Sequence, residues 1–193
     1  MLIVGLTGGL ACGKSFIAAE LGRLGCYVVE ADELGHDVLK RGGEAYEATL
    51  REFGTVDRAL LAQKVFGDPG ELAKLNSIVH PAVHSRAQRI FAEIRAREPG
   101  AIAIYVAAIL VETGAWRNFD KLIVADCSRS TQLERAIGRD AAVEADVLAR
   151  LERQLPSEKK LEHADFVIET NGTKENTLRQ IKMVYEELRK LAL

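Results

Sequence analysis

Short apolar runs alternate with longer amphipathic stretches along this chain. Five apolar runs have the length of strands: Leu2–Leu6, Cys26–Val29, Ala101–Val106, Lys121–Ala125 and Phe166–Ile168. Runs that are apolar at nearly every position are typical of parallel strands covered on both faces. The stretches Pro81–Arg97 and Thr173–Leu191 instead repeat apolar residues with the helical period. This alternation predicts an α/β fold with a parallel sheet.

Two segments between predicted strands are longer than a simple crossover needs. Residues 30–100 have room for several helices, and residues 126–165 are rich in charge. In an α/β domain, long insertions after strands lie at the carboxyl edge of the sheet, where ligands bind. We therefore expect both segments to contribute to a binding site.

Composition narrows the class of protein. The chain has 193 residues, of which 48% are hydrophobic and 28% charged, as in a globular domain with a full core. A net charge of −2 argues against a general nucleic-acid or anionic-membrane binder. The start of the chain lacks the pattern of a signal peptide, and no apolar run has the length of a membrane span.

The cysteines indicate a reducing compartment. There are three, with no paired or metal-binding spacing, so we expect a cytoplasmic protein with Cys26 and Cys127 as small core residues. The expected partner is a small-molecule substrate, with neither nucleic acid nor membrane involved. The sequence leaves the oligomeric state open, and a monomer is compatible with it.

The most informative stretch is GLTGGLACGKS, residues 5–15. From Gly8 to Ser15 it matches G-x-x-x-x-G-K-[ST]. Glycines let consecutive backbone N–H groups curl around phosphate oxygens, and the helix starting near Lys14 adds the positive end of its dipole. Lys14 would reach the β- and γ-phosphates of ATP, and the Ser15 hydroxyl would hold Mg²⁺. The predicted ATP-binding residues of the loop are Gly9, Ala11, Cys12, Gly13, Lys14, Ser15 and Phe16.

A phosphate-binding loop does not specify a reaction. The guanine-reading pattern N-K-x-D of GTPases is not matched by the closest stretch, residues 171–174. The chain is too short for a helicase, whereas small nucleotide and metabolite kinases fit its length. An ATP-binding regulatory protein without turnover is the alternative from a different class.

Further motifs follow in order: VVEADELGH (28–36), NSIVHP (76–81), AAILVETG (107–114), QLERAIGRD (132–140), RLERQLPSEKK (150–160) and ADFVIETNG (164–172). Together with the glycine loop, this series resembles the dephospho-coenzyme A kinases over nearly the whole chain. The resemblance implies transfer of the γ-phosphoryl group of ATP to the ribose 3′-hydroxyl of dephospho-coenzyme A. Another small-molecule or nucleoside monophosphate kinase on the same scaffold is the nearest alternative.

The resemblance also implies an architecture. We expect a P-loop NTPase fold, with a five-stranded parallel sheet flanked by helices, as a single kinase domain over residues 1–193. A helical substrate-binding region would span about 33–97, and a mobile lid about 129–163.

Asp32 is the candidate catalytic base. It follows the second predicted strand, at the carboxyl edge of the sheet beside the phosphate loop. A carboxylate there can orient or deprotonate the attacking hydroxyl and help to hold Mg²⁺ through water. The alternative is an N-cap, a frequent role for Asp before a helix.

Other candidate residues come from the resemblance. Those facing dephospho-coenzyme A would be Asp32, His36, His80, Leu110 and Glu112, and those facing the nucleotide Arg135, Arg139, Asn171 and Gly172. Arg139 joins Lys14 and Asp32 as a catalytic residue because arginines neutralise the charge that develops in phosphoryl transfer. We expect Pro81 to begin a helix directly after His80. The remaining charges of the second insertion, Arg153, Lys159 and Lys160, should face solvent.

The chain departs from the family pattern at a few positions. Cys12 replaces a small polar residue of the loop, and Phe16 stands where many such loops carry a second hydroxyl. Ala108 replaces a common proline, and Val106 or Ala107 occupies the place of an acid. The loss of that acid leaves Ser15, Asp32 and water to hold the metal.

Overall fold

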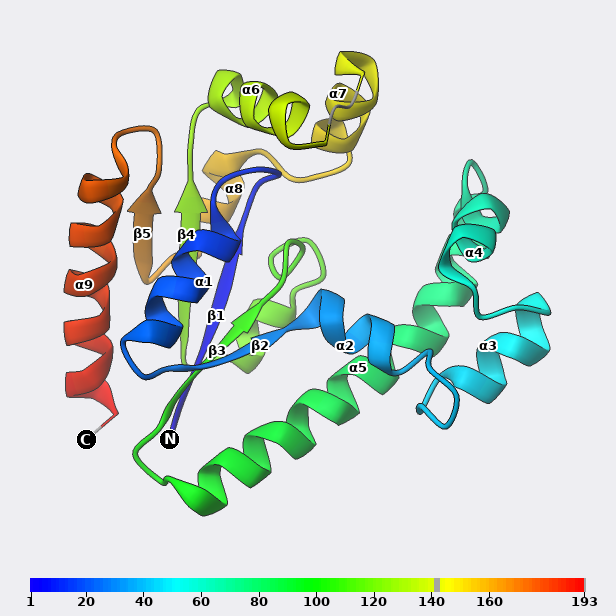
Figure 1. The fold of residues 1–193 in the computed structure, drawn as a ribbon, viewed down its shortest axis with the longest axis horizontal. Coiled ribbons are helices and arrows are strands. Elements are labelled where there is room, and N and C mark those ends of the chain that lie inside the picture. Colours follow the sequence, from blue (N-terminus) through cyan, green and yellow to red (C-terminus); the bar gives the residue numbers. More distant parts are fainter. Residues whose placement is uncertain (141–142, 193) are drawn as a thin grey trace. The chain divides into compact units, whose positions relative to one another are not determined.

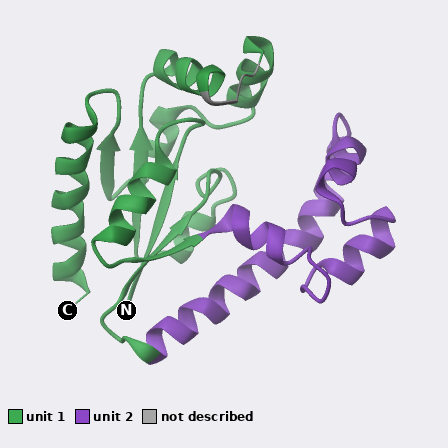
Figure 2. Ribbon diagram, viewed as in Figure 1, with its two compact units in different colours: residues 1–29, 97–193 green, residues 30–96 purple. Residues whose placement is uncertain are grey.

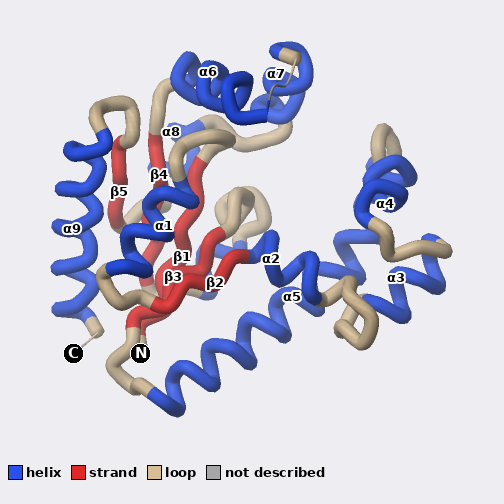
Figure 3. Tube along the Cα trace, viewed as in Figure 1, coloured by secondary structure: helices blue, strands red, loops and turns tan. Residues whose placement is uncertain are grey.

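A five-stranded parallel sheet forms the centre of the fold, with the strand order β2-β3-β1-β4-β5 (Figures 1 and 3). The computed structural model describes residues 1–140 and 143–192, without the side chains of Arg139 and Asp140. The strands are β1 (Leu2–Gly8), β2 (Tyr27–Glu30), β3 (Ile102–Val106), β4 (Lys121–Asp126) and β5 (Phe166–Glu169). All five predicted strands are confirmed, with ends shifted by one or two residues, and so is the predicted fold class.

The chain divides into two compact units (Figure 2). Unit 1 comprises residues 1–29 and 97–193 and contains nearly all of the sheet. Its helices are α1 (Lys14–Arg23), the short 3₁₀ helix η1 (Ala115–Asn118), α6 (Arg129–Asp140), α7 (Glu144–Glu152), α8 (Ser157–Leu161) and α9 (Lys174–Leu191). The Thr173 side chain accepts a hydrogen bond from the Asn176 N–H and so caps α9 where the sequence predicts its start.

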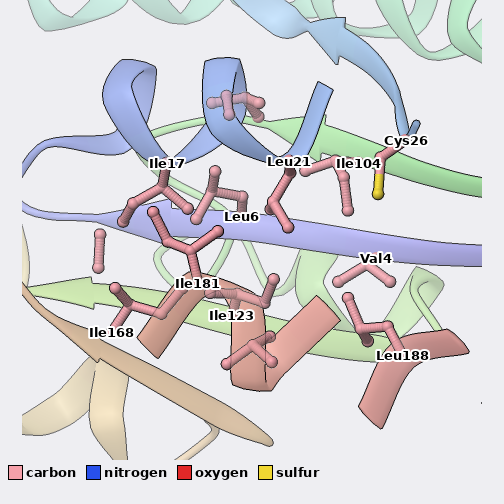
Figure 4. Packing of buried hydrophobic residues seen from close by; sticks show 14 of the residues in the cluster. Val4, Leu6, Ile17, Leu21, Cys26, Ile104, Ile123, Ile168, Ile181 and Leu188 are labelled. Carbon is pink, nitrogen blue, oxygen red and sulfur yellow. The ribbon is translucent and has the colours of Figure 1, made fainter. Parts of the chain in front are cut away.

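Alternation along the strands sends side chains to two apolar layers of unit 1. On one face, Leu6 of β1 and Ile123 of β4 pack with Ile17 of α1 and Ile181 of α9, all at most 1% exposed (Figure 4). On the other face, Leu122 and its neighbour Val124 pack with the segment that follows β3. Burial on both faces explains why the central strands β1, β3 and β4 are almost wholly apolar in sequence, whereas the edge strands β2 and β5 are only partly buried.

Unit 2, residues 30–96, is helical (Figure 2). Its helices are α2 (Ala31–Asp37), α3 (Tyr46–Phe53), α4 (Arg58–Val65) and α5 (Pro69–Arg97), the last of which extends one residue beyond the unit. The Asp57 carboxylate caps α4 by accepting from the N–H groups of Ala59 and Leu60. Arg86 of α5 pairs with Glu44, which precedes α3.

The start predicted for the last of these helices is wrong. α5 begins at Pro69, and Pro81 lies within it. The Asp68 carboxylate accepts from the Gly70 and Glu71 N–H groups, so Asp-Pro is the helix start signal. We expected Pro81 to begin the helix because the apolar period is clear only after it. An interior proline costs a helical hydrogen bond but does not end a helix whose other contacts hold it.

Candidate active site

The glycine loop joins β1 to α1. Gly13 caps α1 in the left-handed conformation (φ 80°), and Ala11 adopts a positive φ of 57° without being glycine. A Cβ on Gly8 would lie 2.3 Å from the Ala125 carbonyl oxygen, and one on Gly9 would lie 2.0 Å from Gln132 Nε2. The glycine at 8 is therefore also required by close packing against the backbone of β4, whereas a Cβ at 9 would only displace the end of the Gln132 side chain.

Positive charge lies at the mouth of this loop. Lys14 Nζ donates hydrogen bonds to the carbonyl oxygens of Gly8 (2.9 Å) and Gly9 (2.8 Å). Ser15 follows in the first turn of α1 and is exposed, and that turn carries no acidic residue. A helix N-terminus beside an ammonium group is suited to a phosphate anion.

Three distant segments hold the loop in place. The Leu10 N–H donates to Gln154 Oε1 (2.8 Å), and Thr170 Oγ1 donates to the carbonyl of Cys12 (3.3 Å). Gln132 Nε2 donates to Cys12 Sγ (2.9 Å). Sequence reasoning missed these supporting residues. Gln132 and Gln154 lie within the recognised motifs, but a neutral amide carries no charge pattern to mark it.

The loop cysteine contacts a second thiol. Cys12 and Cys127 are both buried, and the Cys127 thiol donates to Cys12 Sγ at 3.0 Å. This hydrogen bond, helped by Gln132 and the charge of Lys14, lowers the pKa of Cys12 to about 6 despite burial. The same bond, together with burial, raises the pKa of Cys127. The expectation that Cys26 and Cys127 are core residues is confirmed.

α6 and the turn after β5 are joined beside the loop. Arg135 donates to Thr170 Oγ1 (3.0 Å) and to the Thr170 carbonyl. Asn171 Oδ1 accepts from the Ser128 N–H at 2.7 Å, which ties the ends of β4 and β5 together. Gly172 follows in the same turn. The structure thus gathers Arg135, Asn171 and Gly172; the side chain of Arg139 lies outside the described residues.

A cavity of about 510 Å³ opens next to this turn. Gly9 of the loop, Asp126 at the end of β4, and Gln154 and Ser157 from the segment around α8 line it. Ser157 Oγ donates to Asp126 Oδ1. The cavity lies at the carboxyl end of the strands, as expected for ligand sites in open α/β sheets.

The position of Lys160 corrects the sequence prediction. Its side chain is fully buried, donates to the Ala108 carbonyl (3.0 Å) and pairs with Glu112 Oε1 (2.5 Å). Glu112 Oε1 also accepts from the Leu155 N–H (3.2 Å). A charge run usually marks a solvated face, but a lysine can be buried where a carboxylate compensates its charge.

The other residues of unit 1 that the sequence analysis singled out differ in their exposure. Arg153 and Lys159 are exposed, as expected. Leu110 is 3% exposed and packs with Leu122 and Val124 in the second apolar layer. Phe16 is half-buried against the first layer, behind the phosphate loop.

Within unit 2, Asp32 and His36 lie one turn apart on α2, and both are exposed. Glu30 is the N-cap residue of α2, so Asp32 is not a cap, contrary to the alternative considered from sequence. Asp32 follows the last residue of β2 by two positions. Arg58 Nη1 lies 3.4 Å from His36 Nδ1. His80 is exposed on α5.

The parallel sheet, the glycine loop between β1 and α1, and the Lys14–Ser15 pair define a P-loop protein. The family model for dephospho-CoA kinase matches residues 2–176. The chain belongs to the dephospho-CoA kinase family. It is therefore an ATP-dependent phosphotransferase that converts dephospho-CoA to CoA, the final step of CoA biosynthesis.

Individual relatives agree with this assignment. The dephospho-CoA kinase of Aquifex aeolicus is 38% identical over 96% of both chains, and that of Geobacter sulfurreducens is 35% identical over 96% of this chain and 98% of its own. The crystal structure of TT1252 from Thermus thermophilus has a TM-score of 0.81 at 30% identity, with 97% of each chain covered. The dephospho-CoA kinase from Campylobacter jejuni, at 24% identity and a TM-score of 0.66 over 97% of each chain, shows the same fold.

The alternatives drawn from sequence, another acceptor or a regulator without turnover, are not supported by this family membership. Within residues 1–140 and 143–192, no helix combines the length and the apolar character needed to cross a membrane.

Proposed function

We propose that the glycine loop binds the triphosphate of ATP and that Lys14 supplies the charge for phosphoryl transfer. The observation that carries this proposal is the position of the Lys14 ammonium group, between the carbonyls of Gly8 and Gly9 at the start of α1. Little covalent chemistry is required of the protein in phosphoryl transfer, so positioning and charge neutralisation supply most of the catalysis.

Magnesium fits the donor set at this end of the loop. Mg²⁺ prefers oxygen ligands and usually keeps several waters while it binds substrate phosphates. The exposed Ser15 hydroxyl, in the turn that follows Lys14, is such a ligand. When bound with ATP, the ion would neutralise charge on the phosphate oxygens. Val106 or Ala107 stands where the family pattern has an acid, so Ser15 and water would hold the ion on this side.

The acceptor side of the reaction is assigned to Asp32. Its carboxylate is exposed, is not used as a helix cap, and lies just beyond the carboxyl end of β2. We propose that it orients the 3′-hydroxyl of dephospho-CoA and accepts its proton. His36 and His80, both exposed in the helical unit, would contact the same substrate.

The adenine side of ATP is assigned to the turn after β5. Asn171 and Gly172 would lie against the base, and Arg135 holds that turn through Thr170. Arg139, four residues along α6, would neutralise the transferring phosphoryl group when a lid of about 129–163 closes. Glu112, held by its ion pair with Lys160, would contribute to the substrate site. Leu110 would contribute by supporting the same segment from the core. Because the reaction consumes ATP, we place it in the cytoplasm.

An acceptor panel tests the function together with the loop. Purified protein is given ATP, Mg²⁺ and, in turn, dephospho-CoA, AMP, CMP or shikimate. Only dephospho-CoA should be phosphorylated. The turnover of the Lys14→Ala protein should be lower by at least about 10²-fold, the loss expected when one charge-stabilising group is removed. Lys182→Ala, an exposed lysine on α9, is the matched control and should keep the wild-type rate. A folded Lys14→Ala protein with wild-type turnover would disprove the loop assignment.

A further inference from the structure

Two thiols from distant parts of the chain meet behind the phosphate loop. Cys12 belongs to the loop itself, and Cys127 directly follows β4. Their sulfur atoms are 3.0 Å apart, with the Cys127 thiol donating to Cys12 Sγ. A disulfide has a sulfur–sulfur distance of about 2.05 Å. The two atoms therefore need to approach by only about 1 Å, the difference between 3.0 Å and that bond length, to become linked.

The surroundings of the pair assign different roles to the two sulfurs. Cys12 Sγ accepts hydrogen bonds from both Cys127 and Gln132 Nε2, and Lys14 adds a nearby positive charge. These groups stabilise the thiolate of Cys12, whose pKa is lowered to about 6, whereas Cys127 keeps its proton. A thiolate is the nucleophilic form of cysteine, and a neighbouring thiol completes the arrangement of a redox-sensitive pair.

A route for a small oxidant leads to this pair. Cys127, together with Gly9 and Gln132, lines the cavity of about 510 Å³ beside the loop. Cys26, the remaining cysteine, is not in that lining, and burial raises its pKa to about 12. The pair therefore has proximity and a thiolate, and the cavity leads to Cys127, behind which Cys12 is fully buried at 3.0 Å, while the third cysteine has neither a thiol partner nor thiolate character.

We propose that Cys12 and Cys127 are a modification site, at which a peroxide forms an intramolecular disulfide that reversibly switches off ATP binding. The Cys12 thiolate attacks one peroxide oxygen, the O–O bond breaks, and Cys12 sulfenic acid and hydroxide form. The hydroxide takes the Cys127 proton and becomes water. The Cys127 thiolate then attacks Cys12 Sγ, the S–O bond breaks, and the leaving hydroxide takes a proton from solvent. Two sulfurs are oxidised and one peroxide is reduced to two waters.

The link acts on the backbone that would hold the phosphates, so this effect rests on the proposed role of the loop. The Cys12 N–H bonds to the Gly9 carbonyl (3.3 Å), and its carbonyl accepts from Thr170 Oγ1. Drawing Cys12 toward β4 strains both bonds, and its neutralised sulfur becomes a weaker acceptor for Gln132. A displacement near 1 Å in a positioning group can cost about 10²-fold in rate.

The test uses the full chain, first fully reduced and then treated with hydrogen peroxide. Free thiols are alkylated, and the peptides are examined by mass spectrometry. Turnover of dephospho-CoA and ATP affinity are measured before oxidation, after it, and after addition of dithiothreitol. We expect a Cys12–Cys127 linked peptide, free Cys26, and a loss of turnover of about 10²-fold that dithiothreitol restores.

Two serine variants serve as controls, each compared with its own reduced state. Cys26→Ser should behave as wild type on oxidation. Cys127→Ser removes the resolving thiol, so no link should form, and oxidation of Cys12 should proceed to products that dithiothreitol does not reverse. The linked mass is read without any activity measurement, and turnover of the reduced protein tests the proposed function separately.

Two results would overturn the proposal. The first is that Cys12 and Cys127 both remain open to alkylation after peroxide treatment that oxidises a free thiol standard. The second is that the linked protein binds ATP as tightly as the reduced protein.

Discussion

The Gln154 side chain is hydrogen-bonded to the backbone of the phosphate loop, because Gln154 Oε1 accepts from the Leu10 N–H at 2.8 Å. Gln154 directly precedes Leu155, whose N–H is bonded to Glu112 on the segment after β3. The stretch between α7 and α8 is therefore tied both to the loop and to the core. A change in this stretch should be transmitted to the phosphate site.

Gln154→Ala should raise the KM for ATP by roughly fivefold, because a hydrogen bond of about 1 kcal/mol no longer orders the loop. Gln154→Glu keeps the acceptor but adds negative charge next to the phosphates, so it should raise KM further. Steady-state kinetics with varied ATP measure both. Gln180→Ala is the matched control, since Gln180 makes similar bonds to Glu169 of β5. An unchanged KM in Gln154→Ala would show that the bond to Leu10 does not order the loop.

The buried pair Glu112–Lys160 should be costly to break. Lys160→Met leaves the Glu112 carboxylate without its counter-ion, and Glu112 Oε2 is already buried with no hydrogen-bond partner. We expect a loss of about 3–5 kcal/mol in the free energy of unfolding, measured by urea denaturation. The double variant with Glu112→Gln and Lys160→Met should recover part of the lost free energy of unfolding.

The neighbouring lysine provides the control for that pair. Lys159 pairs with Glu162 on the surface, with both side chains more than half exposed. Lys159→Met should hardly change the unfolding curve, because exposed ion pairs contribute little. Equal effects of Lys159→Met and Lys160→Met would contradict the importance assigned to burial.

Asp32→Asn tests the assignment of the base. It keeps the size of the side chain but removes the charge that would orient or deprotonate the acceptor hydroxyl. Turnover should fall by about 10²- to 10⁴-fold, while ATP affinity and melting temperature stay near wild type. Glu33→Gln, an exposed carboxylate beside it, is the control. Turnover near wild type in Asp32→Asn would refute the catalytic role.

Stability should depend on pH through Cys12. Its pKa is lowered from 9.0 to about 6, so its contribution is complete above pH 9 and is lost as pH falls to 6. Cys127, whose pKa is raised from 9.0, opposes the trend only as its thiol begins to ionise in the unfolded state near pH 9, so the comparison is made between pH 6 and 8. Under reducing conditions, the stability difference between wild type and Cys12→Ser should grow with pH, by at most about 1.4 kcal/mol per pH unit. A difference that stays constant between these pH values would exclude a thiolate at Cys12.

Periodicity alone was enough to find the sheet. Each of the five strands contains a short run of consecutive apolar residues, and such runs are typical of a parallel sheet. The start of α5 could not be found this way. The first turns of α5 carry no clear apolar face, so the helical period becomes visible only after Pro81. Without that period, Asp68-Pro69 is a weaker signal for a helix start than Pro81.

The loop and the class of reaction could likewise be read from the order of the motifs, because phosphate binding demands particular residue types at fixed spacing. Contacts between distant segments had no such pattern. Lys160 looked like any surface lysine until the fold placed Glu112 and the Ala108 carbonyl around it. Cys127 looked like a small core residue until β4 brought its thiol to Cys12. Local spacing determines which backbone groups can meet a phosphate, whereas the packing of β4, α6 and α8 around the loop decides which side chains lose water, and hence which charges and thiols are altered.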